Sequence, residues 1–112
     1  MKTKLDKVAI YEAKKKSGKL IKLSKDSDVA VRAAAYRAMG SIGDQASLEE
    51  CQNNVRDDSP EVRLAIAEAF QKMGDDHVAE ALRHQMLEET DPKLKSAFEK
   101  AVEFNRGRRG GL

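Results

Sequence analysis

Residues 25–44 read KDSDVAVRAAAYRAMGSIGD, and residues 56–75 read RDDSPEVRLAIAEAFQKMGD. The second stretch lies 31 positions after the first, and the two stretches share several residues at corresponding positions. A fixed period of this length is typical of stacked helical repeats, in which each copy packs on the next. The identical pairs include Val31 and Val62, Arg32 and Arg63, Ala34 and Ala65, Ala38 and Ala69, Gly43 and Gly74, and Asp44 and Asp75.

Each repeat is predicted to contain two helices, which we call helix A and helix B. The apolar residues of helix A recur at the i, i+3, i+4 and i+7 positions that form one face of a helix. In the second repeat we expect helix A to run from about Asp28 to Gly40. Helix B should then turn Leu48, Cys51 and Val55 toward the core, because these residues also share one helical face.

The helix boundaries have their own signals. Ser59 and Asp91 each precede a proline, which is the pattern of an N-cap followed by proline at the first helical position. Gly43 and Gly74 are predicted to be the left-handed residues that end helix A, because glycine adopts positive φ without steric cost. Asp44 is then placed to cap helix B.

The first repeat is abbreviated. Tyr11, Ala13 and Gly18 match residues of the second repeat at an offset of 25, and Gly18 corresponds to the glycine at the end of helix A. The first helix B is therefore predicted to be only a turn or two long. About seven helical segments are expected in total, and the last is a helix A without a partner.

The composition supports an all-α fold. Of the 112 residues, 40% are hydrophobic but only 4% are aromatic, and alanine is the main apolar residue of the repeats. Small side chains allow helices to pack closely, whereas a β-sandwich or barrel needs more β-branched and aromatic residues. We predict a right-handed α-α superhelix, a short α-solenoid of about three helical-hairpin repeats plus a capping helix. It should form a single domain over residues 1–105, followed by a flexible basic tail at residues 106–112.

The Val-Arg pair and the Gly-Asp pair, which stand at a fixed distance in both copies, resemble the HEAT repeat. The similarity is to the short version of about thirty residues that is best known from phycobilisome lyase-type proteins, and it covers about residues 5–105. The resemblance implies a scaffold for protein partners, since most HEAT arrays have this role. Only a few HEAT arrays are enzymes or bind nucleic acid.

The resemblance also implies a ladder of ion pairs between repeats. By position, Arg32 and Arg63 would pair with Asp44 and Asp75 of the turns between helices A and B. Lys95 stands where a third arginine would be, and a lysine cannot make the same bidentate contact with a carboxylate. The last junction is therefore expected to be looser.

The outward residues of the two helices B form the predicted contact surface, on the expected concave side of the array. They are picked by the 31-residue period as the positions opposite the apolar face. A contact surface usually needs an aromatic or arginine anchor, and only Arg56 and Arg83 qualify here. An ordinary solvated helix face is the alternative explanation, because Glu, Gln and Asn are common on any helix exterior. The predicted partner-binding residues are Glu49, Gln52, Asn53, Arg56, Glu80, Arg83, His84 and Leu87.

The charge distribution supports a second candidate partner. Residues 1–25 hold nine lysines against two acidic residues, although the net charge of the chain is only +2. The lysine-rich first helix and the Arg/Gly tail could together bind nucleic acid or an acidic partner. Solubilising lysines on a terminal helix are the alternative explanation.

Catalysis and cofactor binding are not expected. Cys51 is the single cysteine and lies on an apolar face, so it is predicted to be a buried side chain rather than a nucleophile. His77 and His84 are seven residues apart, which is a poor spacing for a metal pair. We predict a non-catalytic protein-binding module without cofactors, in a cytoplasmic monomer with no signal peptide or membrane span. A subunit of a phycobilisome lyase-like enzyme is kept as a further alternative.

Overall fold

The structure, a computed structural model, describes residues 1–108. Within this range the chain forms helices and no strands, in agreement with the predicted number of helical segments. The helices are α1 (Lys4–Ala13), α2 (Ser17–Leu23), α3 (Val29–Ile42), α4 (Gln45–Asn53), α5 (Pro60–Ala69), α6 (Asp76–Glu88) and α7 (Pro92–Asn105).

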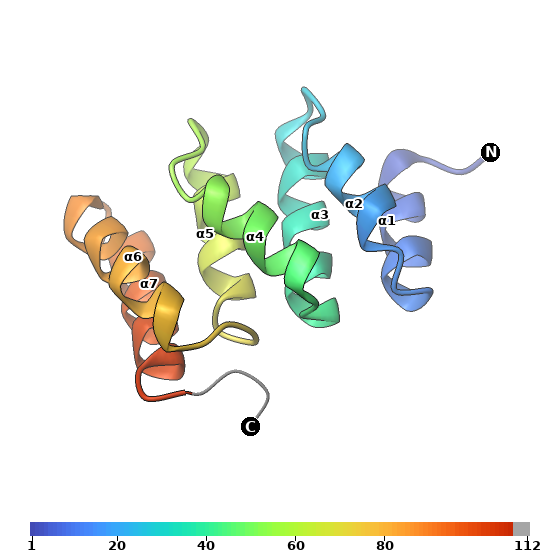
Figure 1. Cartoon of the computed structure of the whole chain (residues 1–112). Helices are drawn as coiled ribbons and strands as arrows, with labels where there is room; N and C mark the ends of the chain where they lie inside the picture. Colours follow the sequence, from blue (N-terminus) through green and yellow to red (C-terminus); the bar gives the residue numbers. More distant parts are fainter. Residues whose placement is uncertain (109–112) are drawn as a thin grey trace.

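The helices form two layers (Figure 1). Helices α1, α3, α5 and α7 are the predicted helices A, and each packs on the next in that order. Helices α2, α4 and α6 are the predicted helices B and form the second layer. Within this second layer α2 contacts α4, whereas α6 packs chiefly on α7. This arrangement confirms the prediction of an all-α, short helical solenoid.

The predicted caps are present. The Ser59 hydroxyl accepts a hydrogen bond from the first turn of α5, and the Asp91 carboxylate does the same for α7. Asp44 caps α4 by accepting from the backbone N–H of Ser47 at 2.9 Å. Gly43 ends α3 with φ of 67°, which is the left-handed conformation that favours glycine.

The core runs through both layers. Tyr36, Phe70 and Phe98 are fully buried, one from each of the three consecutive repeats. Ala65, at a position that repeats with the period of the sequence, is also buried. Burial raises the pKa of the Tyr36 phenol to about 12, because the charged form would lose its hydration in the core.

Helix α5 ends earlier than predicted. It stops at Ala69, and Gly74 is not its cap, although Gly74 does have a positive φ of 120°. The side chain of Asn105, which is fully buried, donates a hydrogen bond to the Phe70 carbonyl at 2.8 Å. This carbonyl is therefore satisfied by α7, and a further helical turn is not needed to pair it.

The alignment of the first repeat is wrong at Gly18. This glycine lies inside α2, and the left-handed residue between α1 and α2 is Lys15, with φ of 54°. The short first hairpin makes its turn earlier than the match to the second repeat indicates.

The predicted ladder has different acidic partners. Arg32 pairs with Asp57 at 3.1 Å, and Arg63 pairs with Glu89 at 2.8 Å. Both arginines lie in the first turn of their helix, whereas Asp44 caps the helix that follows α3. A helix of the length of α3 separates its two ends by about 20 Å, so an arginine at the start cannot reach the turn that follows the end.

The ladder instead spans the loops that lead into each helix A. The Arg63 guanidinium also donates to the carbonyls of Asp57 and Asp58, at 2.8 and 3.2 Å, and thereby holds the loop before its own helix. The hydrogen bond that the Arg32 guanidinium donates to the Asp57 carboxylate raises the pKa of Arg32. Lys95, at the third position, is exposed.

The first residues of the predicted tail contact the body of the protein. The backbone N–H of Gly107 donates to the Asp76 carboxylate at 2.6 Å, and the Arg108 guanidinium lies over the Phe104 ring. Asp76 in turn donates its backbone N–H to the Arg108 carbonyl at 2.9 Å. The remaining residues of that predicted tail, 109–112, lie outside the described part of the chain.

Candidate functional site

The eight predicted contact residues all lie in the layer of helices B. We call them the B strip: Glu49, Gln52, Asn53, Arg56, Glu80, Arg83, His84 and Leu87. Seven of them are exposed, and Gln52 is half-buried. Sequence periodicity therefore identified the outward face of these helices.

The α4 part of the B strip is positioned by two buried neighbours. Cys51 and Ser47, one turn apart, face the core and are fully buried. Residues about half a turn away, such as Glu49 and Asn53, must therefore face outward. Glu49 accepts a hydrogen bond from Gln45 at 3.2 Å, which fixes the carboxylate along the helix.

The α6 part combines charge with an exposed apolar side chain. Glu80 lies 3.4 Å from the Arg83 guanidinium and 3.7 Å from the His84 imidazole. Leu87, one turn beyond, keeps 56% of its surface exposed. The outward face of α6 therefore combines exposed apolar area with exposed charged side chains.

One ion pair connects the two parts. The Arg56 guanidinium, just after α4, lies 2.9 Å from the Glu88 carboxylate at the end of α6. Glu88 is therefore a member of this surface that the sequence reasoning missed. The repeat period relates equivalent positions of two copies and does not identify contacts between different positions, so it contains no signal for Glu88.

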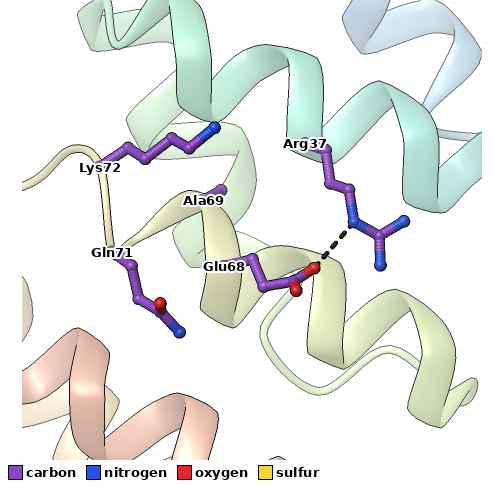
Figure 2. A pocket seen from close by; sticks show the side chains of 5 residues that line it. All are labelled: Arg37, Glu68, Ala69, Gln71 and Lys72. Carbon is purple, nitrogen blue, oxygen red and sulfur yellow. Dashed lines mark hydrogen bonds and ion pairs between the residues drawn. The ribbon is translucent and has the colours of Figure 1, made fainter.

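One groove at the edge of the B strip, with a volume of about 490 Å³, is lined by Asn53 and Arg56 together with Arg32 and Asp57. Another groove lies on the layer of helices A. The groove in Figure 2, with a volume of about 370 Å³, lies between α3 and α5 and is lined by Arg37, Glu68, Ala69, Gln71 and Lys72. Arg37 and Glu68 face each other across it, with 2.8 Å between their charged atoms. Gln71 extends toward α7 and donates to a backbone carbonyl of that helix at 3.1 Å. None of the residues that line this second groove belongs to the B strip.

The second candidate surface was predicted to combine the lysine-rich first helix with the Arg/Gly tail, but the fold separates these two segments. Helices α1 and α7 stand at opposite ends of the array (Figure 1). The lysines of α1 are therefore distant from residues 106–108, which follow α7. The two basic segments do not form one patch in the described part of the chain.

The reactive side chains have unremarkable chemistry. Cys51 is fully buried, and this burial raises the pKa of its thiol. His77 and His84 are exposed. Among residues 1–108, no group of three or more His, Cys, Asp or Glu side chains is arranged to hold a metal ion. No helix within these residues has the length and apolar character to cross a membrane.

Comparison with known proteins is consistent with this geometry. The family model for HEAT repeats matches residues 18–103. No curated protein and no solved structure gives a significant match. HEAT repeats generally act as scaffolds for protein interactions, and the family is typically non-catalytic. The matched residues include all of α3 to α6 and the B strip and cover more than half of the chain, so the chain belongs to the HEAT repeat family.

Proposed function

We propose that this protein is a non-catalytic interaction module that docks a protein partner on the B strip. The observation that carries the proposal is the exposed Leu87 beside Arg83, on the outward face of a helix B of a HEAT array. The general role of the family in protein interactions supports the same interpretation.

The energetics of the B strip favour a few anchor residues. Burying the exposed half of a leucine contributes about 1 kcal/mol to binding. The ion pairs of Arg83 and Arg56 are solvent-exposed and therefore contribute little to folding. A partner carboxylate can replace Glu80 or Glu88 as the acceptor for these arginines without destabilising the helices.

Binding should be tested with purified chain as bait in an extract of the native host, with the recovered protein then purified for titration. Leu87→Ala and Arg83→Ala should each weaken its affinity, and the double variant should weaken it by at least about tenfold, as expected for anchor residues. Leu5→Ala is the matched control, because Leu5 is also an exposed leucine, with 48% exposure, but lies on α1.

The Leu5→Ala control distinguishes binding at the B strip from nonspecific hydrophobic binding. Leu5→Ala should leave the affinity unchanged, and circular dichroism should show that every variant keeps its helices. A partner that binds equally well when all eight residues of the B strip are replaced would exclude this surface as the docking site.

A further inference from the structure

The two ends of the array expose different kinds of side chain. Helix α1 has no helix A before it among residues 1–108, and α7 has none after it (Figure 1). Counting from the N-cap of each helix A identifies equivalent residues, which face either the preceding or the following helix A. The four N-caps are Thr3, Asp28, Ser59 and Asp91.

The face toward the preceding helix A contains alanine at a fixed position. The tenth residue after the N-cap is Ala38 in α3, Ala69 in α5 and Ala101 in α7, and all three are buried. Ala69 packs so closely on α3 that a Cβ atom added to Gly40 would lie 2.7 Å from the Ala69 Cβ. The sixth and seventh residues after the N-cap are also apolar in these helices, and all are buried except Ala34, which is half-buried: Ala34, Ala35, Ala65, Ile66, Ala97 and Phe98.

Helix α1 has the same residue types without a helix that covers them. Ala9, Ile10 and Ala13 are the sixth, seventh and tenth residues after Thr3. Both alanines are exposed, and Ile10 is half-buried. Leu5, one turn before Ala9, is 48% exposed. We call Leu5, Ala9, Ile10 and Ala13 the α1 face, which is an apolar surface of three helical turns at one end of the array.

The opposite end of the array is polar at the equivalent interface. The fifth residue after the N-cap lies toward the following helix A, since Leu64 lines a groove with residues of α7. In α7 the fifth and eighth residues are Ser96 and Glu99, and both are exposed. A second copy that stacked its α7 on the α1 face would bury these polar groups without partners, which is unfavourable. The other helices A have apolar or aromatic residues there: Val8, Tyr11, Ala33, Tyr36, Leu64 and Ala67.

The ion pairs of the array indicate which charge suits the α1 face. The ninth residue after the N-cap is Arg37 in α3 and Glu68 in α5, and these two pair at 2.8 Å (Figure 2). Glu12 has this position in α1 and forms no ion pair among residues 1–108. Glu12 lines a groove of about 410 Å³ together with Ala9 and Ala13. A basic residue on a helix in front of α1 would therefore meet Glu12 as Arg37 meets Glu68.

We propose that the α1 face binds an amphipathic helix of a partner protein, which packs on α1 as α3 packs on α5. The helix presents small apolar residues to Ala9 and Ala13 and a basic residue to Glu12. Asp6, where the other helices A have valine or leucine, adds a second exposed carboxylate at the edge of this face and suits the same basic partner. This contact is separate from the B strip, which belongs to the helices B.

The probe is a fluorescein-labelled peptide with the sequence of residues 28–43, because α3 is the helix that covers the equivalent face of α5. A hydrocarbon staple between positions 34 and 38 keeps the peptide helical and lies on a different face from Arg37 and Gly40. Fluorescence anisotropy with the full chain should show saturable binding. No saturable binding at concentrations up to about 1 mM would overturn the proposal.

Variants of the chain locate the contact. Replacing Ala9 and Ala13 together by glutamine should weaken peptide binding by at least about tenfold, because the longer side chains keep the helices apart. The matched control replaces Ala30 and Ala46, which are exposed alanines of α3 and α4, by glutamine. Circular dichroism should show that both double variants keep their helices. Equal loss of affinity in the two variants would contradict binding at the α1 face.

Variants of the peptide test its orientation. Arg37→Glu in the peptide should weaken binding by about threefold, which is the scale of an exposed ion pair. Glu12→Lys in the chain should restore the affinity for this altered peptide. Absence of this rescue would show that Glu12 does not face the basic residue and would overturn the proposed packing.

Sedimentation of the chain alone distinguishes a partner helix from a second copy. The original chain should be monomeric at the concentrations of the titration. A dimer that is lost when Ala9 and Ala13 are replaced would assign the α1 face to a second copy and overturn the proposal. Leu87→Ala should bind the peptide as the original chain does, so this proposal and docking on the B strip can fail separately.

Discussion

At the scale of single residues, the tightest point of the fold is the approach of Gly40 in α3 to Ala69 in α5. A Cβ atom added at position 40 would lie 2.6 Å from the Ala69 Cα and 2.7 Å from its Cβ. Both atoms belong to a short, rigid residue that cannot rotate away. The small side chains at this helix crossing are therefore required by the distance between the helices.

We expect Gly40→Ala to destabilise the protein by about 2 kcal/mol, because α3 and α5 must move apart to admit the methyl group. Urea unfolding followed by circular dichroism measures this change. Gly18→Ala is the matched control, because Gly18 is also helical but has nothing within 4 Å of the added Cβ. That variant should be more stable by about 0.5–1 kcal/mol, and a stabilising Gly40→Ala would show that the helices are not packed this closely.

The sequence predicted which arginines are structural, but it did not predict which carboxylates they pair with. The repeat picked out Arg32 and Arg63 as structural residues, and both do form ion pairs between repeats. Their predicted partners were wrong because a conserved spacing between two residues does not say that they touch. Asp44 recurs with the arginine because it caps α4, which is a separate requirement of the same repeat.

At the scale of secondary-structure elements, the junctions between repeats differ in how far they exclude water. Arg63 and Glu89 have side chains that are 20% and 5% exposed. Gln85 also donates to Glu89 at 2.8 Å, so this carboxylate is held from two sides inside the junction. The Arg37–Glu68 pair between α3 and α5 has a similar length, but nearly half of each side chain is exposed.

We expect Arg63→Ala to destabilise the protein by about 2–3 kcal/mol, because it leaves the buried charge of Glu89 without its cation. Arg37→Ala is the comparison, since it breaks an exposed ion pair between helices and should cost less than about 1 kcal/mol. Urea denaturation of the two variants measures the difference. Equal effects would mean that burial of the Arg63–Glu89 pair does not matter.

Element boundaries were predicted where a local signal determines them. The proline at the start of α5 or α7 and the glycine at the end of α3 are local signals, and all three boundaries were correct. The end of α5 depends instead on Asn105, which lies 35 residues from the carbonyl that it binds. No local pattern contains that information, so the prediction extended the helix too far.

At the scale of the whole molecule, several carboxylates in the first half of the chain are stabilised in their charged form. The Lys4 side chain lowers the pKa of Asp26, and the hydrogen bonds of Thr3 lower that of Asp6. Partial burial opposes ionisation of Asp44, but the hydrogen bonds from Ser47 and Ser17 outweigh it and lower its pKa from the ordinary value of 3.8.

These shifts predict a loss of stability in acid. A carboxylate with a lowered pKa in the folded state contributes its full stabilisation above the unfolded value of about 3.9, and this contribution disappears as the pH falls through the folded pKa. The free energy of unfolding should therefore decrease below about pH 4. Asp44→Asn keeps a good N-cap but does not titrate, so it should show a weaker dependence on pH in urea unfolding. Identical pH profiles would argue against a contribution from Asp44.

The candidate site could be predicted only in part. The period of the repeat located the outward face of α4 and α6, because a helix face follows from spacing alone. The inclusion of Glu88 and the separation of the two basic segments depend on how repeats stack, which no single repeat encodes. Gln52 was placed outward but is half-buried.

Because α6 packs on α7, the pair of helices that packs together is not the pair that forms one sequence repeat. By sequence, α6 closes the hairpin that α5 begins, but its main neighbour belongs to the following copy. Asn105 and Gly107 add bonds from the end of α7 to the segment around α5 and α6. A chain cut at the repeat boundary before Pro92 would therefore expose the inner face of α6, with Val78 and Leu82, to water. Helix α7 thus covers the inner face of α6, and shortened versions of this protein should end after α7 rather than before it.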